Sequence, residues 1–168
     1  MKSIILKGSL IVTFVASLLI GASAFGDSNQ KNGVALEGYD VVAYFQNHER
    51  GIERGTKGTK KFSTKIMDVT YYFVSEENKD NFDADPEKYI PAYGGWCAWA
   101  MAQGQTGVSV NYDTFLIEEN VYGQKSLYLF YNSWGNNTKK KWLEHLHYDL
   151  MLKADETWQK VIQPNGTE

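Results

Sequence analysis

The most reactive side chain in the sequence is the thiol of Cys97, the single cysteine among 168 residues. Cys97 follows Gly94-Gly95, so we expect it in the first turn of a short helix that begins at Trp96. The positive end of a helix dipole favours the thiolate, the form that binds metals and attacks disulfides. Met101 stands four residues later on the same helix face, and a thiolate with a thioether suits Cu(I). Cys97 and Met101 are therefore the candidate metal ligands, with a packed cysteine and a core methionine as the alternative.

Aromatic residues in the same part of the sequence, and one near the start of the expected domain, indicate a second candidate site. Tyr39, Tyr93 and Trp96 combine apolar rings with polar tips that need partners when they are buried. Asp40 adds a carboxylate directly after Tyr39. These four residues are candidates for the lining of a pocket that binds a small molecule. The alternatives are a turn capped by Asp40 and an aromatic core.

The histidines indicate a site less strongly. His147 and Met151 lie four residues apart on an expected helix, whereas His145 points about 200° away from His147 and cannot chelate a metal with it. We expect both histidines on the exposed helix surface. Asp155, on the same helix, is expected to accept a structural hydrogen bond from a Trp or Tyr. No serine nucleophile motif or phosphate-binding loop is found, so no catalytic residue is predicted.

Composition excludes several classes of protein. The chain has 17 Lys and Arg against 20 Asp and Glu, a net charge of −3, which argues against binding to nucleic acid. One cysteine excludes an internal disulfide and every multi-cysteine zinc or iron–sulfur site. A hydrophobic content of 43% with only three prolines argues against intrinsic disorder.

The first 24 residues are typical of a cleavable signal peptide. Lys2 and Lys7 precede an uncharged apolar run at 10–20, and Ala22-Ser23-Ala24 supplies the small residues of a cleavage site. A retained membrane anchor is the alternative, because the apolar stretch is nearly long enough to span a bilayer. Cleavage would remove two lysines and take the net charge from −3 to −5. We therefore expect a secreted or periplasmic protein without a lasting membrane anchor.

The remaining chain predicts a single domain at 37–163, after a flexible lead-in at 25–36 and before a tail at 164–168. Strands are expected at 41–45, 62–66, 69–74, 108–110, 115–117 and 127–131. Helices are expected at 76–82 after an N-cap at Ser75, from Pro86, at 96–102 and at 138–162. The last helix is amphipathic, with apolar residues every four positions. The predicted fold is α+β, a small antiparallel sheet packed against short helices and one long C-terminal amphipathic helix.

Several stretches of the sequence carry a common pattern over nearly the whole predicted domain. They are Gly38-Tyr39-Asp40-Val41-Val42-Ala43-Tyr44-Phe45, Tyr72-Phe73-Val74-Ser75-Glu76-Glu77-Asn78-Lys79 with Phe82, Asp85-Pro86-Glu87-Lys88-Tyr89, Pro91-Ala92-Tyr93-Gly94-Gly95-Trp96-Cys97-Ala98-Trp99-Ala100, and Lys153-Ala154-Asp155 with Trp158. This pattern resembles the exported branch of the YHS domain family. The resemblance implies metal binding, the usual suggestion for YHS domains, although the exported branch generally lacks an assigned activity. The metal-linked members carry cysteines where this chain has Val74, Ser75 and Asn78.

The sequence therefore predicts a non-enzymatic, exported domain that binds a metal ion or a small molecule. Copper bound through Cys97 is the leading expectation. A thiol-based redox protein that uses Cys97 is one alternative, and a structural or interaction module without a ligand is the other. No nucleic-acid partner is expected.

Overall fold

The computed structural model of the chain describes residues 28–164. The predicted signal peptide at 1–24, residues 25–27 of the predicted lead-in and residues 165–168 of the predicted tail lie outside this range. Among the described residues no helix is both long enough and apolar enough to cross a membrane.

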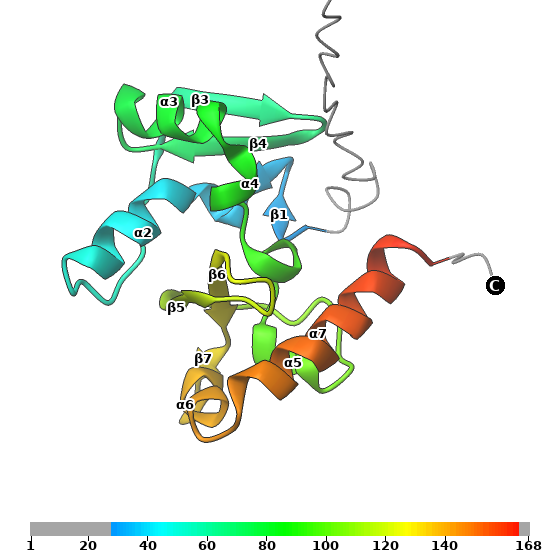
Figure 1. Cartoon of the computed structure of the whole chain (residues 1–168). Coiled ribbons are helices and arrows are strands. Elements are labelled where there is room, and N and C mark those ends of the chain that lie inside the picture. Colours follow the sequence, from blue (N-terminus) through cyan, green and yellow to red (C-terminus); the bar gives the residue numbers. More distant parts are fainter. Residues whose placement is uncertain (1–27, 165–168) are drawn as a thin grey trace, which may run out of the picture.

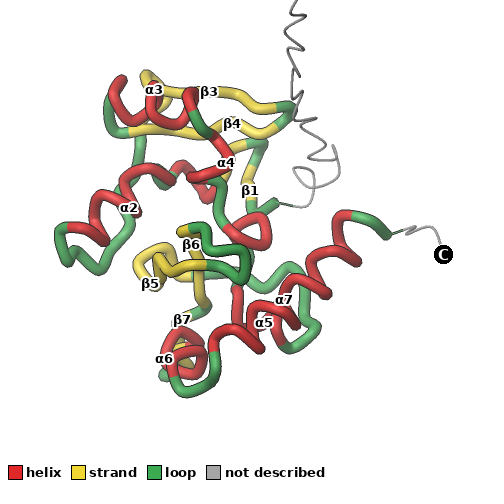
Figure 2. The backbone as a smooth tube through the Cα atoms, viewed as in Figure 1, coloured by secondary structure: helices red, strands yellow, loops and turns green. Residues whose placement is uncertain are grey.

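Groups of two to four strands alternate with groups of helices along the described chain (Figures 1 and 2). The strands are β1 (Gln30–Lys31), β2 (Val34–Ala35), β3 (Thr59–Ile66), β4 (Val69–Phe73), β5 (Asn111–Glu119), β6 (Lys125–Phe130), β7 (Asn132–Ser133) and β8 (Asn136–Asn137). The helices are η1 (Leu36–Gly38), α2 (Val41–Glu49), α3 (Glu76–Ala84), α4 (Pro86–Tyr89), η2 (Ala92–Gly95), α5 (Ala98–Ala102), α6 (Thr138–Leu143) and α7 (His147–Ile162). The predicted α+β class is confirmed.

The strands form one larger sheet and two hairpins. The larger sheet has the order β1-β2-β4-β3, and its β2–β4 pair is parallel, so it is mixed rather than purely antiparallel. β5 pairs with β6, and β7 pairs with β8, both antiparallel. The predicted hairpin at 62–66 and 69–74 corresponds to β3 and β4. The strand predicted at 108–110 does not form, and β5 begins only at Asn111.

The β5–β6 hairpin separates two hydrophobic cores. Side chains alternate across a strand, so Leu127 and Leu129 of β6 pack into the first core, whereas Tyr128 and Phe130 pack into the second. The first core also contains α2, the larger sheet and Phe82 of α3. The second contains η2, α5, α6 and α7. Figure 1 shows the hairpin between these two halves of the molecule.

Residues 28–36, assigned above to a flexible lead-in, take part in the fold. β2 pairs with β4 at Val34 and Thr70, and the Thr70 N–H donates to the Gly33 carbonyl over 2.8 Å. Ala35 and Leu36 are buried in the first core. Such short strands have too few residues to show an alternating hydrophobic pattern, and their position depends on the neighbour with which they pair.

Residues 41–45, predicted as a strand, lie in helix α2. The N-cap is Asp40, whose carboxylate accepts hydrogen bonds from the N–H groups of Val42 and Ala43. A short apolar run fits a buried strand and a buried helix equally well. The prediction is therefore wrong because the helix is buried on most sides and shows little amphipathic periodicity.

The single helix predicted at 138–162 is divided into α6 and α7. The break brings two side chains to one carboxylate: Trp142 Nε1 donates to Glu118 Oε1 over 2.9 Å, and His147 Nδ1 lies 2.7 Å from Glu118 Oε2. In a continuous helix these two side chains would point about 140° apart. Glu118 on β5 therefore favours the break, which contains neither Gly nor Pro.

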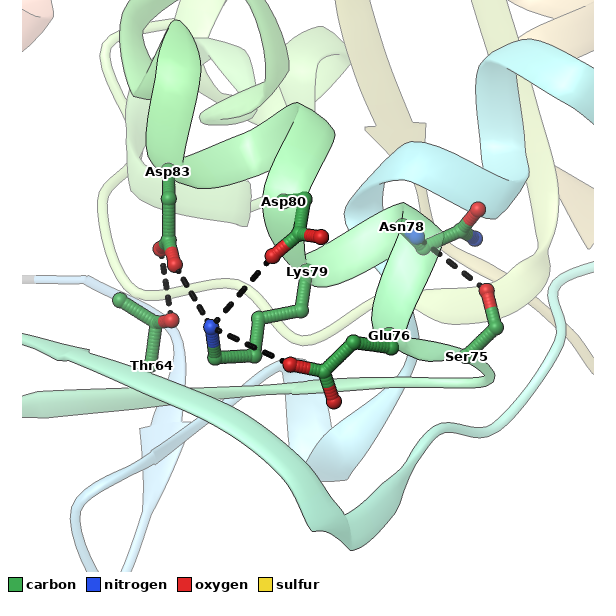
Figure 3. A network of polar contacts seen from close by, with 7 residues as sticks. All are labelled: Thr64, Ser75, Glu76, Asn78, Lys79, Asp80 and Asp83. Carbon is green, nitrogen blue, oxygen red and sulfur yellow. Dashed lines mark hydrogen bonds and ion pairs between the residues drawn. The ribbon is translucent and has the colours of Figure 1, made fainter.

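Helix α3 confirms its predicted N-cap and adds a surface network (Figure 3). The Ser75 hydroxyl accepts a hydrogen bond from the Asn78 N–H. On the exposed side, Lys79 Nζ lies 2.9 Å from Asp83 Oδ2, and Thr64 of β3 donates to the same carboxylate over 2.6 Å. Partial burial acts to raise the pKa of Asp83, but these two contacts outweigh it and lower the pKa. The network attaches α3 to the edge of the larger sheet.

Candidate functional site

The Tyr93-Gly94-Gly95 turn brings three distant segments together. All three residues have positive φ, with values of 55°, 60° and 83°. A Cβ on Gly94 would lie 2.8 Å from Cη2 of Trp158 and 3.0 Å from Cα of Ser28, both closer than packing allows. A Cβ on Gly95 would lie 2.4 Å from Cδ2 of Leu36. The two glycines therefore admit α7 on one side and the N-terminal segment on the other.

Hydrogen bonds hold the N-terminal segment against this turn. The Asn29 N–H donates to the Gly94 carbonyl over 2.8 Å, and the Asn29 side-chain amide donates to the Gly95 carbonyl over 3.0 Å. The Leu36 N–H donates to the Asn29 carbonyl. Asn29 is buried, so the segment is attached to the domain rather than lying loosely on it.

A cavity of about 190 Å³ opens beside this turn, where the two cores meet. Its wall is mainly apolar and comprises Ala35, Leu36, Ile90, Pro91 and Trp158, together with the polar residues Tyr71 and Glu87. Tyr71 belongs to the first core, and Trp158 packs against the second. Ligand sites often form at such junctions, where two packed units leave a concave gap.

Tyr71 supplies the cavity with an unused hydrogen-bonding group. Its side chain is 3% exposed, and its hydroxyl makes no hydrogen bond with any residue that the structure describes. Every fully buried polar side-chain atom in residues 28–164 has a partner, so this hydroxyl must touch open space. Tyr71 is one of the residues that line the cavity, which gives its hydroxyl such a space. Burial raises the pKa of the Tyr71 hydroxyl, which therefore stays protonated at neutral pH.

A second, more open hollow of about 280 Å³ lies on the other side of Trp158. It is lined by Trp96 and Met101 as well as by Ser28 and Trp158, which border both spaces. Of the four residues predicted to form a pocket, Trp96 lines this hollow. Tyr39 instead stacks on Tyr112, with ring centroids 4.5 Å apart. The four residues are therefore not brought together.

Asp40 is completely buried, and its carboxylate is fully used by the fold. Oδ1 accepts from Val42 and Ala43 at the start of α2, as described above. Oδ2 accepts from the Val74 N–H and from the Asn78 side-chain amide, each over 2.8 Å. The capping role expected as one alternative is confirmed, although the cap begins a helix and not a strand.

Cys97 lies at the N-cap position of α5, one residue before the first helical turn. Its side chain is 1% exposed, and Sγ accepts a hydrogen bond from the Tyr131 N–H over 3.3 Å. The Thr138 hydroxyl lies 3.4 Å from Sγ. Met101 is also buried, in the second core. In the described part of the chain, no three residues among His, Cys, Asp and Glu are grouped to hold a metal ion.

The polar residues in and just before α7 agree with the prediction except at His147. His147 is only partly exposed, because it pairs with Glu118, while His145 is exposed and lies edge-on to Trp99. Asp155 accepts a hydrogen bond from the Tyr93 hydroxyl over 3.1 Å, as expected. Burial raises the pKa of Asp155, and the Tyr93 hydrogen bond opposes that rise.

Sequence reasoning missed Glu118 and the principal cavity residues Tyr71, Ile90 and Glu87. Glu118 is the first of two successive glutamates at the end of β5, and only its two distant partners give it a role. The YHS-like pattern contains Pro91, Gly94, Trp158 and Glu87. Nothing in the sequence, however, indicates that these four residues line the same cavity. Comparisons of the chain with protein-family models, with curated proteins and with solved structures found no match.

Proposed function

We propose that this chain is an exported YHS-type domain that binds a small, mainly apolar molecule in the cavity beside Trp158, without catalysing a reaction on it. The observation that carries the proposal is the Tyr71 hydroxyl, nearly buried and without a partner among the described residues, in a cavity whose wall is mainly apolar. A ligand with one polar group would complete its hydrogen bonding. Export rests on the sequence pattern at 1–24.

The YHS-like stretches of the sequence support the choice of this cavity. Glu87, Pro91, Gly94 and Trp158 belong to three separate stretches of that pattern, and all four line the same space. The Gly94-Gly95 turn also explains why this part of the sequence contains two glycines, since bulkier residues would collide with the segments that form the wall. The YHS-like pattern therefore supplies several residues of the cavity wall and the turn beside it.

Binding is proposed rather than catalysis because of the chemistry of the lining. In the described part of the cavity wall, Glu87 is the one carboxylate and Tyr71 the one phenol, and neither is paired with a nucleophile or a base. An activated nucleophile needs an adjacent general base within hydrogen-bonding reach. The lining offers recognition without an activated group.

The copper and redox hypotheses have less support. Both need the Cys97 thiol to be accessible, and its side chain is 1% exposed and held by Tyr131 and Thr138. Met101, the second candidate ligand, is buried in the second core as well. These hypotheses stay predictions.

The proposal is tested by NMR titration of the exported protein with 2-phenylethanol, a single ring with one hydroxyl. We expect saturable shifts of the Trp158 indole N–H with a Kd of about 0.1–1 mM, as ligand efficiency allows for a compound of this size. Ala35→Leu and Ile90→Phe each fill the cavity and should weaken binding at least about tenfold.

Ala84→Leu, the same substitution at an exposed position of α3, is the matched control and should bind like the wild type. Thermal unfolding of each variant establishes that it is folded. If the Trp158 signal fails to move up to the solubility limit of the probe, or if both filled variants bind normally, the cavity is not a ligand site.

A further inference from the structure

We infer that the ligand of this cavity is a small organic cation, a single ring that carries a short protonated amine, with the amine paired to Glu87 and the ring between the apolar walls. This inference rests on the proposed function and specifies its ligand. The described cavity wall contributes one formal charge, that of Glu87, and an apolar surface for the rest of the molecule.

The charge of Glu87 is not used by the fold. No lysine, arginine or histidine of residues 28–164 lies within ion-pair distance of its carboxylate, whereas Lys31 pairs with Glu37 at 3.6 Å. Lys88 follows Glu87 in sequence but lies over the Tyr89 ring, 4.9 Å from its centroid. Lys88 and Lys125 border a separate hollow with Glu87, and neither lines the cavity. A cation entering the cavity would meet a carboxylate without a competing ion pair.

The size of the cavity restricts the ligand to about one ring. An apolar cavity of about 150 Å³ accommodates benzene, and this one has about 190 Å³. The difference between these two volumes leaves room for a ring and a tail of two or three atoms. Drug-sized ligands occupy pockets of about 300 Å³ or more, so a larger molecule would have to project into solvent.

Two aromatic residues favour a cationic group further. The Tyr71 hydroxyl can accept a hydrogen bond from an ammonium group, and it has no competing partner among the described residues. The Trp158 indole also lines the cavity, and the face of an indole attracts cations more strongly than that of any other side chain. A carboxylate ligand would instead be repelled by Glu87, with no basic residue in the described wall to offset the repulsion.

The experiment compares three probes of similar size at neutral pH and low salt: 2-phenylethylamine, 2-phenylethanol and phenylacetate. We expect the amine to bind about two- to fivefold more tightly than the alcohol, the range of a partly exposed ion pair. Phenylacetate should bind most weakly. The advantage of the amine should shrink as salt is added, because Glu87 is an exposed residue and its charge is screened by salt.

Variants assign the effect to individual side chains. Glu87→Gln should abolish the advantage of the amine, so that the ratio of the amine and alcohol affinities falls to about one. Glu77→Gln, an exposed carboxylate of α3 that borders no described cavity, is the matched control and should change neither affinity. Tyr71→Phe should weaken the amine and the alcohol alike by about two- to tenfold, since it removes a hydrogen bond that both probes can make.

The outcomes separate this inference from the proposed function. If none of the probes binds, the proposed function fails. If the alcohol binds as tightly as the amine, or if Glu87→Gln keeps the preference for the amine, the cavity is a ligand site but the assignment of a cation is wrong.

Discussion

The two cores of this protein contain very different buried polar groups. Beside the first core, the Asp40 carboxylate accepts four hydrogen bonds of 2.8–3.0 Å. The donors lie in α2, directly after β4 and in α3. At the edge of the second, the Cys97 thiol has two long contacts of 3.3 and 3.4 Å to Tyr131 and Thr138. Both residues stand in prominent motifs of the sequence, yet only the Asp40 carboxylate connects three elements of the fold by short hydrogen bonds.

The difference follows from the strength of each interaction. A buried carboxylate is expensive to desolvate, so it is tolerated only when several donors compensate it, and those donors depend on it in turn. A thiol is a weak hydrogen-bonding group that packs much like a small apolar side chain. The elements around the first core are therefore held by the Asp40 carboxylate, and those around the second by packing at the Tyr93-Gly94-Gly95 turn. The following predictions test this contrast, from the largest effect to the smallest.

Asp40→Ala should destabilise the protein by about 3–5 kcal/mol, because it removes the cap of α2 and leaves buried donors of Val74 and Asn78 without an acceptor. Urea unfolding followed by circular dichroism measures the change. Asp68→Ala, at a fully exposed carboxylate, is the control and should cost less than about 0.5 kcal/mol. A loss below about 1 kcal/mol at Asp40 would contradict a central role for its carboxylate.

Gly95→Ala should cost about 2–4 kcal/mol, since the new methyl group would collide with Leu36 and the residue would have to keep a φ of 83°. Gly104→Ala is the matched control, because Gly104 has a φ of 76° and no atom within 4 Å of the new Cβ. It should cost only about 1–2 kcal/mol, the part due to the backbone. Equal losses at both positions would show that close approach at Gly95 contributes nothing.

Cys97→Ser should have the smallest effect, about 1 kcal/mol, because serine fits the space and can keep a contact with Tyr131 or Thr138. The same variant tests copper. After dialysis with Cu(I) under reducing conditions, we expect neither the wild type nor the variant to retain metal in a one-to-one ratio. Retention by the wild type and loss in the variant would establish the copper hypothesis and weaken our proposal.

Local signals of the sequence were sufficient for part of the fold. The hairpin of β3 and β4, the Ser75 cap of α3 and the start of α4 at Pro86 depend on residues close together in the chain. These elements were predicted because their hydrogen bonds and their backbone preferences are local. The α+β class followed from the same elements.

Other elements depend on distant partners and could not be predicted locally. Val41–Glu49 is helical because Asp40 caps it and neighbouring elements bury it on several sides. The break between α6 and α7 depends on Glu118, more than twenty residues earlier in the chain. The cavity needs Ala35, Tyr71, Ile90 and Trp158 together, and no spacing in the sequence indicates that these four meet.

The class of fold and the capping role open to Asp40 follow from the sequence, because backbone conformation and capping are decided within a few residues. Only tertiary contacts bury Cys97 and form the cavity beside Trp158, whose lining includes Tyr71, a residue with no partner for its hydroxyl among residues 28–164. Burial and cavities arise where separate segments pack against one another imperfectly. The candidate site therefore lies at the junction between the two cores and not at the Cys97 thiol.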